Sequence, residues 1–222
     1  MNGGTFADRA DAGQRLAARL SAYARQNDVV VLALPRGGVP VGYEVARTLG
    51  APLDVLVVRK LGVPGHEELA MGAVAGGGVR VLDAEVVRFL HIPPGVIQRV
   101  SEAERAEVER RERAYRGNRP APEVRGRTVI LVDDGIATGS TCLAAIQALR
   151  QREPARVVVA APVAPASTCR ALRQAADEVV CVREPEYLGS VGGWYRSFPQ
   201  TSDHEVRAQL ARSMVEPAAA AV

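Results

Sequence analysis

The sequence predicts an α/β protein whose core is a parallel β-sheet with helices on both faces. Two observations predict this class. First, strand-like and helix-like segments alternate along the 222 residues, which is typical of a parallel sheet. Second, the strand-like runs are apolar throughout, as in VVVLAL at 29–34 and TVILVD at 128–133. Such runs fit strands that are buried on both faces.

The N-terminal half is expected to begin with a helix and to continue with strands and glycine-rich turns. Thr5 and Asp8 have the spacing of a capping box, and apolar residues then follow helical spacing to about Gln26. The expected elements, in order, are a helix at 5–26, a strand at 29–34, a turn at 35–42, a helix at 43–49, a strand at 54–60, a mobile glycine-rich loop at 61–78 and a short strand at 79–83.

The C-terminal half is expected to open with a long helix from Pro94 to about Arg116. Proline is well tolerated in the first turn of a helix, and three Glu–Arg pairs with i,i+4 spacing support the rest. These pairs are Glu107–Arg111, Glu109–Arg113 and Glu112–Arg116. We expect this helix to face solvent or a second copy of the chain. Strands at 128–133, 155–162 and 177–182 and helices at 140–151 and 165–175 follow.

Composition is typical of a globular protein in water, with 47% hydrophobic and 24% charged residues. The net charge of +3 is too small to indicate a nucleic-acid partner. The three cysteines lack the spacing of known zinc motifs, so reduced thiols are expected. The N-terminus lacks a signal-peptide pattern, and no apolar run approaches the roughly 18 residues of a membrane helix. We therefore expect a cytoplasmic protein without a membrane segment.

The segment VILVDDGIATGST at 129–141 carries the most chemical information. Asp133 and Asp134 follow an apolar strand, where two adjacent carboxylates favour a nearby cation or hydroxyl donors. Ser140 and Thr141 then open a helix, whose free amides form a natural phosphate site. Carboxylates that accept hydrogen bonds from hydroxyl groups, one loop away from a phosphate site, fit a ribose 5-phosphate.

Two other interpretations of this segment remain. It resembles an ordinary strand-to-helix turn in which Thr138, Ser140 and Thr141 only cap the helix. An acidic pair after a strand also occurs in phospho-acceptor receiver domains. A receiver needs another acid or a lysine at a later strand end, and ARVVVAAPVAP at 155–165 supplies neither.

VILVDDGIATGST resembles the phosphoribosyl-pyrophosphate signature of type I phosphoribosyltransferases. LPRGGVPVG resembles the pyrophosphate loop of that family, and VVRKLG resembles the Arg-Lys that ends the next strand in its adenine and orotate members. Roughly residues 5–215 are similar to a bacterial group of predicted phosphoribosyltransferases. The resemblance implies a single type I phosphoribosyltransferase domain over 1–222. Its Rossmann-like core would span about residues 27–182. A hood would be formed by residues 5–26 and 183–215, and the domain would also have a flexible loop.

The resemblance also implies roles for individual residues. Asp133 and Asp134 would bind the ribose hydroxyls, and the loop at 137–141 would hold the 5-phosphate. The loop at 36–38, often with a cis peptide in this family, would contact pyrophosphate, and Arg59 with Lys60 would neutralise its charge. The implied catalytic residues are Arg59, Lys60, Asp133 and Asp134. The implied substrate-binding residues are Arg36, Gly37, Gly38, Ala137, Thr138, Gly139, Ser140 and Thr141.

The implied reaction joins an acceptor, expected to be a nitrogenous base, to C1 of the ribose of Mg²⁺-bound phosphoribosyl pyrophosphate and releases pyrophosphate. The magnesium ion would be held by the substrate. A homodimer is compatible with the resemblance. The alternative is a non-catalytic regulator that binds the same ligand, which would need a nucleic-acid surface. Interleaved acidic and basic residues argue against such a surface.

Two departures from the family pattern are informative. Ala137 stands where the 6-oxopurine members have an aspartate that handles the base proton, so hypoxanthine and guanine are weaker candidates for the acceptor. Ser140 replaces the commoner glycine and can add a hydrogen bond to phosphate.

Two weaker signals remain open. His66 lies in the expected lid, and three rings, Trp194, Tyr195 and Phe198, form either a stacking surface for the acceptor or a small core.

Overall fold

The computed structural model describes residues 4–215, and it describes only the backbone of Glu67 and Glu68. Its centre is a five-stranded sheet in which all neighbouring strands are parallel. The strand order is β2 (Leu53–Val55), β1 (Val29–Ala33), β6 (Thr128–Val132), β7 (Arg156–Val163) and β8 (Glu178–Arg183). This sheet confirms the predicted parallel α/β core.

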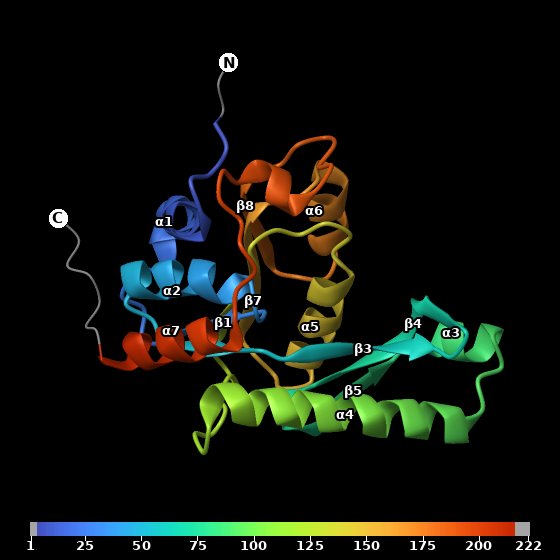
Figure 1. Cartoon of the computed structure of the whole chain (residues 1–222). Coiled ribbons are helices and arrows are strands. Elements are labelled where there is room, and N and C mark those ends of the chain that lie inside the picture. Colours follow the sequence, from blue (N-terminus) through green and yellow to red (C-terminus); the bar gives the residue numbers. More distant parts are fainter. Residues whose placement is uncertain (1–3, 216–222) are drawn as a thin grey trace.

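Helices cover both faces of this sheet (Figure 1). On one face lie α1 (Arg9–Arg19), α2 (Gly38–Leu49) and α7 (Asp203–Val215), and on the other lie α5 (Ser140–Arg150) and α6 (Ala166–Leu172). Alternate residues of β1 enter two different hydrophobic clusters: Val29 and Val31 join the first, and Val30 and Leu32 join the second. Burial on both faces explains why these strands are apolar throughout.

A second, antiparallel sheet extends away from the core, as Figure 1 shows. It contains β3 (Val58–Val63), β4 (His66–Ala75) and β5 (Val79–Leu82), with the short 3-10 helix η2 (Gly76–Gly78) before β5. Helix α3 (Ala84–Phe89) follows, and the 23-residue α4 (Pro94–Arg116) packs along the sheet.

This second sheet corrects two predictions. The single strand expected at 54–60 is divided between β2 of the core sheet and β3 of the small sheet. The glycine-rich segment expected to be a mobile loop at 61–78 is mostly strand. Two of its glycines serve close packing: a Cβ at Gly72 would lie 2.2 Å from the carbonyl oxygen of Val81, and one at Gly76 would lie 1.9 Å from Oε1 of Glu112.

A buried ion-pair network attaches the end of α4 to the core sheet. Nε of Arg116 lies 2.9 Å from both carboxylate oxygens of Asp54, and Nη1 donates to Glu112 at 2.6 Å. The expected Glu112–Arg116 and Glu107–Arg111 pairs are thus formed. Arg113 instead donates to the backbone carbonyl of Glu109.

Residues near the start of the described chain pair with residues 194–196 beside the core. Phe6 donates its amide hydrogen to Trp194 at 2.8 Å and accepts one from Arg196 at 2.8 Å. The rings of Phe6 and Tyr195 lie 5.3 Å apart between centroids. Segment 183–201, which includes the 3-10 helix η3 (Val191–Trp194), is therefore fastened to the chain's N-terminal residues.

Some element bounds differ from the predictions. The first helix begins at Arg9, because Asp8 itself is the N-cap and accepts hydrogen bonds from the amides of Ala10 and Asp11. It ends at Arg19, and a 3-10 turn, η1 (Ser21–Tyr23), follows. Helix α2 begins at Gly38 within the predicted turn. None of the helices within residues 4–215 has the length and apolar character that a membrane span needs.

Candidate functional site

Two loops meet at the carboxyl ends of β1 and β6. The amide of Leu34 donates to the carbonyl of Val132 at 2.8 Å, which aligns the two strand ends. A Cβ at Gly37 would lie 2.0 Å from Oδ2 of Asp134, and one at Gly38 would lie 2.7 Å from the carbonyl oxygen of Val132. Only glycine allows this close approach. The peptide bond between Pro35 and Arg36 is cis.

Asp133 is a half-buried carboxylate with an unusual charge balance. Its Oδ1 accepts the backbone amide of Asp134 at 2.9 Å. Burial, followed by the neighbouring charge of Asp134, raises the pKa of Asp133 well above its ordinary value. The ionised form of Asp133 would therefore be stabilised by a hydroxyl donor or a cation delivered by a ligand.

Asp134 is held by a residue that sequence reasoning missed, Arg9 of α1. Nε of Arg9 lies 2.8 Å from Oδ2 of Asp134, and both side chains are largely buried, with exposures of 10% and 15%. The same guanidinium donates to the carbonyl of Pro199 at 2.6 Å and lies 3.8 Å from the ring centroid of Phe198. Tyr195 donates its hydroxyl to the carbonyl of Asp134.

Nothing in the sequence around Arg9 marks it as functional. It is one of many arginines, and it lies in the first turn of a surface helix. Its partner is 125 positions away, so only tertiary structure brings the pair together.

The loop at 137–141 presents the start of α5. Gly139 is the N-cap, with φ of 79°, and it has no side chain with which to cap the helix. The hydroxyl of Thr168 in α6 donates to the carbonyl of Ala137 at 2.8 Å. The hydroxyl oxygens of Thr138 and Ser140 lie 2.8 Å apart. Hydroxyls and the first-turn amides of α5 thus share one surface, as an anion site requires.

A cleft of about 450 Å³ lies beside the glycine loop, Arg9 of α1 and the segment 183–201. Its lining residues are Arg9, Arg36, Gly37, Asp134, Val191, Phe198, Gln200 and Thr201. At one side of it, Nη1 of Arg36 lies 3.8 Å from Oδ1 of Asp203, which also accepts the hydroxyl of Tyr115 at 2.9 Å. Burial and this hydrogen bond raise the pKa of Tyr115 to about 12.

Arg59 and Lys60 occupy a different place from the one expected. They lie on β3 of the small sheet, not at the end of a core strand, and neither lines the cleft. Arg59 donates to Oε2 of Glu104 at 2.6 Å, and this hydrogen bond raises the pKa of Arg59. Lys60 is exposed and forms no ion pair with a side chain in the described part of the chain.

The aromatic residues behave mainly as a small core. Tyr195 is buried and packs with Phe6 and Val163. The indole of Trp194 donates to the carbonyl of Leu188 at 3.0 Å. Phe198 is the one of the three predicted rings that lines the cleft. His66 is exposed at the start of β4.

Comparison with known proteins agrees with this geometry. The model of a family described as "Phosphoribosyl transferase domain" matches residues 6–191. A Mycobacterium tuberculosis (strain H37Rv) protein named "Putative phosphoribosyl transferase Rv0571c" is 49% identical over 208 residues, which is 94% of this chain and 47% of that protein. The chain therefore spans about half the length of the curated relatives it matches.

A solved structure is also similar. The protein TT1426 from Thermus thermophilus shares 42% sequence identity with this chain and superimposes with a TM-score of 0.86. The match covers 94% of this chain and 98% of that one. Because the family model covers most of the chain and these relatives are similar over nearly its whole length, the chain belongs to the phosphoribosyl transferase domain family.

Proposed function

We propose that this chain is a phosphoribosyltransferase that transfers the phosphoribosyl group of phosphoribosyl pyrophosphate to a nitrogenous base and releases pyrophosphate. One observation carries the proposal: the loop with Gly37 and Gly38 touches the acidic pair Asp133 and Asp134, which is one loop away from the N-terminus of α5. A ligand with a phosphate, vicinal hydroxyls and a second charged group fits these three features.

The 5-phosphate is assigned to the start of α5. Its first-turn amides carry partial positive charge, which favours an anion. The hydroxyls of Thr138, Ser140 and Thr141 add donors, and Thr168 holds the loop by its hydrogen bond to Ala137. This assignment uses the Ser140 hydroxyl where the family more often has glycine.

The ribose hydroxyls are assigned mainly to Asp133. Its carboxylate has one oxygen engaged with the amide of Asp134 and lacks a cationic partner as close as the one that Arg9 gives Asp134. Asp134 is already paired with Arg9, so its carboxylate would both hold the loop in place and contact the ligand. Two adjacent carboxylates thus take different roles because their neighbours differ.

Pyrophosphate is assigned to the glycine loop of Arg36, Gly37 and Gly38. Arg36 is only weakly held by Asp203, at 3.8 Å and with the Arg36 side chain 37% exposed, so it is able to turn towards an anionic ligand. Lys60 is assigned to pyrophosphate through movement of the hairpin that carries it. Arg59 would first have to leave Glu104.

The donor set is compatible with Mg²⁺ brought in by the substrate. Carboxylates are ligands that Mg²⁺ prefers, and a cation near Asp133 would offset burial and the neighbouring charge of Asp134, which raise the pKa of Asp133. When bound, the ion would balance the charge of the departing pyrophosphate. Substrate oxygens and water would hold it, and Asp133 and Asp134 would contact it through that water.

In the proposed reaction, the bond between C1 and the pyrophosphate oxygen breaks and a bond to the acceptor nitrogen forms. The protein's contribution is to position both partners and to stabilise the developing charges. Arg36 would face the leaving group, Lys60 would reach it after the hairpin moves, and Asp133 would lie beside the ribose ring. Ala137 supplies no proton-transfer group for the acceptor, which favours bases other than the 6-oxopurines.

Turnover tests this function directly. The purified chain, supplied with phosphoribosyl pyrophosphate and Mg²⁺, is incubated with a panel of purine and pyrimidine bases while pyrophosphate release is measured. Release that depends on one of these bases supports the proposal. Tight binding of phosphoribosyl pyrophosphate without base-dependent release would favour the regulator.

Lys60→Ala is expected to weaken binding of phosphoribosyl pyrophosphate about tenfold or more and to leave binding of ribose 5-phosphate unchanged. A hydrogen bond to a charged group contributes about 1.5–3 kcal/mol, and about 1.4 kcal/mol is a factor of ten. Calorimetric titration of both ligands measures this difference. Arg80→Ala, which removes another cation from the same sheet, is the control. Equal losses for the two ligands would remove Lys60 from the pyrophosphate site.

The hairpin of β3 and β4 is expected to become more ordered when phosphoribosyl pyrophosphate binds. Its register shifts twice between Leu61 and Val63, and Gly62 pairs with Ala70, so few regular ladder bonds hold the tip. Hydrogen exchange of amides in 61–70 should slow with ligand, while exchange in β6 stays constant. Identical exchange with and without ligand would show that the hairpin does not close.

A further inference from the structure

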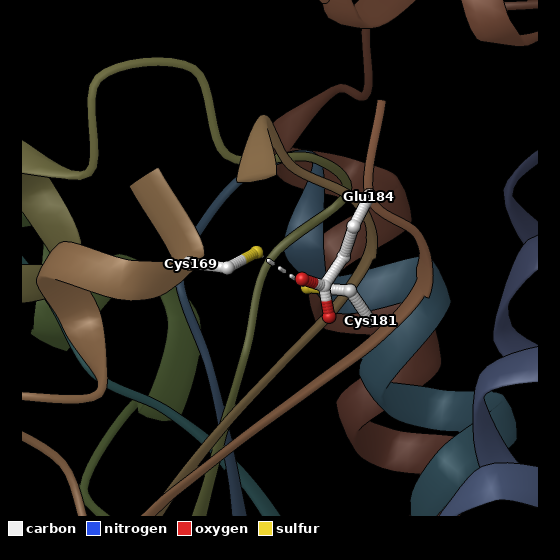
Figure 2. A group of neighbouring side chains, drawn as sticks. All are labelled: Cys169, Cys181 and Glu184. Atoms are coloured by element: carbon white, nitrogen blue, oxygen red, sulfur yellow. Dashed lines mark hydrogen bonds between the residues drawn. The ribbon is translucent and has the colours of Figure 1, made fainter. Parts of the chain in front are cut away.

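A pair of buried cysteines lies outside the site described above. Cys169 is in the middle of α6 and Cys181 is in β8, and their sulfur atoms are 3.5 Å apart. One carboxylate oxygen of Glu184, just beyond the end of β8, lies within 4.8 Å of both sulfurs. Figure 2 shows the three side chains converging from these two elements.

The fold explains why these residues meet. Cys181 belongs to the face of β8 that packs against α5 and α6, in the same cluster as Cys169. The two sulfurs are sheltered, with residue exposures of 0% and 8%. Glu184 is exposed, so the two sulfur atoms are buried and the carboxylate is on the solvent side of the group.

We propose that Cys169, Cys181 and Glu184 bind one thiophilic divalent metal ion of the Zn²⁺ type. Zn–S bonds are about 2.3 Å long, so two sulfurs on one tetrahedral zinc ion lie about 3.8 Å apart. The observed 3.5 Å is close to that separation. The carboxylate supplies a third ligand of a type that zinc accepts, and water would complete the tetrahedron.

Charge at the site is balanced by a nearby cation. Two thiolates and one carboxylate carry three negative charges, of which a divalent ion neutralises two. Arg173 supplies the remaining positive charge, because its Nη2 lies 2.7 Å from Oε1 of Glu184. A carboxylate has a second oxygen, so the ion pair with Arg173 orients Glu184 without excluding coordination.

A regulatory disulfide is a weaker interpretation of the same pair. Redox-sensing cysteines need an exposed thiolate that an oxidant can reach. Cys169 is fully buried. Glu184 would supply the third ligand atom of a metal site, whereas a disulfide would not use it.

The site adjoins the loop at 137–141. Thr168, next to Cys169, donates to the carbonyl of Ala137, and its methyl group would be 3.0 Å from a Cβ placed on Gly139. A metal that fixes Cys169 to β8 would therefore also fix the helix that supports this loop. The familiar zinc spacings are absent because the ligands come from a helix and a strand that meet only in the fold.

Metal titration of the reduced full chain tests the proposal. After dialysis against a chelator, the protein is titrated with Co²⁺, which reports thiolate ligands by near-ultraviolet charge-transfer absorption, and then with Zn²⁺. One ion per chain and a thiolate-to-cobalt band are expected. Cys142→Ser is the matched control, because Cys142 is also buried but lies outside the group.

Three variants at the site and the Cys142→Ser control separate the outcomes. Cys169→Ser and Cys181→Ser should each lose the band, and Cys142→Ser should keep it. Glu184→Gln alters an exposed side chain and so preserves the fold; it should keep the band and weaken binding about tenfold or more. The proposal is overturned if the wild-type chain gives no band at one equivalent, if Cys142→Ser loses it equally, or if Glu184→Gln binds as tightly as wild type.

Discussion

Asp133→Asn is expected to weaken binding of phosphoribosyl pyrophosphate roughly ten- to hundredfold, because each hydrogen bond to a charged group contributes about 1.5–3 kcal/mol. The substitution preserves the shape of the side chain and removes its charge. Asp133 has no ion pair as close as the contact of Arg9 with Asp134. The single substitution is therefore cleaner than one at Asp134, which would leave Arg9 without its partner.

The same variant is expected to be at least as stable as the wild-type chain at neutral pH. The folded-state pKa of Asp133 is raised, mainly by burial, so its ionised form is less favourable in the folded chain than in the unfolded one. The wild-type chain therefore loses stability as pH rises from the unfolded pKa, about 3.9, through the folded pKa. Asparagine does not titrate and avoids this loss.

Calorimetry with phosphoribosyl pyrophosphate and urea unfolding at about pH 5 and about pH 8 measure both effects. Asp28→Asn is the matched control, because Asp28 is exposed at the amino end of β1, the opposite edge of the core sheet. Its affinity for the ligand should equal that of wild type. Undiminished affinity in Asp133→Asn would exclude Asp133 from the ligand site.

Arg9→Met is expected to lower the free energy of unfolding by about 3 kcal/mol, since removing one partner of a buried ion pair leaves the other charge uncompensated. Asp134 would lose its 2.8 Å contact, and Pro199 and Phe198 would lose the guanidinium that links them to α1. Binding of phosphoribosyl pyrophosphate should weaken too, because Asp134 and the segment around Phe198 line the cleft.

Urea unfolding of Arg9→Met and Arg15→Met distinguishes this effect from a general loss of charge on α1. Arg15 pairs with Asp11 on the same helix, but the two side chains are 43% and 27% exposed. Exposed pairs contribute about 0–1 kcal/mol. Equal destabilisation by the two substitutions would show that the Arg9–Asp134 pair does not hold α1 on the core.

The sequence alone was sufficient for most of the core sheet, because the information that specifies a buried strand is local. Apolar runs such as 128–133 predict doubly buried strands, and β6 at Thr128–Val132 confirms that prediction. The helix from Pro94 to Arg116 followed from the proline in its first turn and from its charge spacing. The loops after β1 and β6 meet because the carboxyl ends of parallel strands share an edge of the sheet.

The tertiary structure decided what depends on contacts between distant segments. An apolar run does not reveal which sheet its residues join. The position of Arg59 and Lys60 on β3 of the small sheet was therefore not predictable. Glycines at 61–78 looked mobile, yet Gly72 and Gly76 make room for β5 and α4. Arg9 reaches Asp134, and Cys169 reaches Cys181, only because α1 and α6 pack where they do. Spacing along the chain specifies local conformation, whereas side-chain partners depend on how whole elements pack.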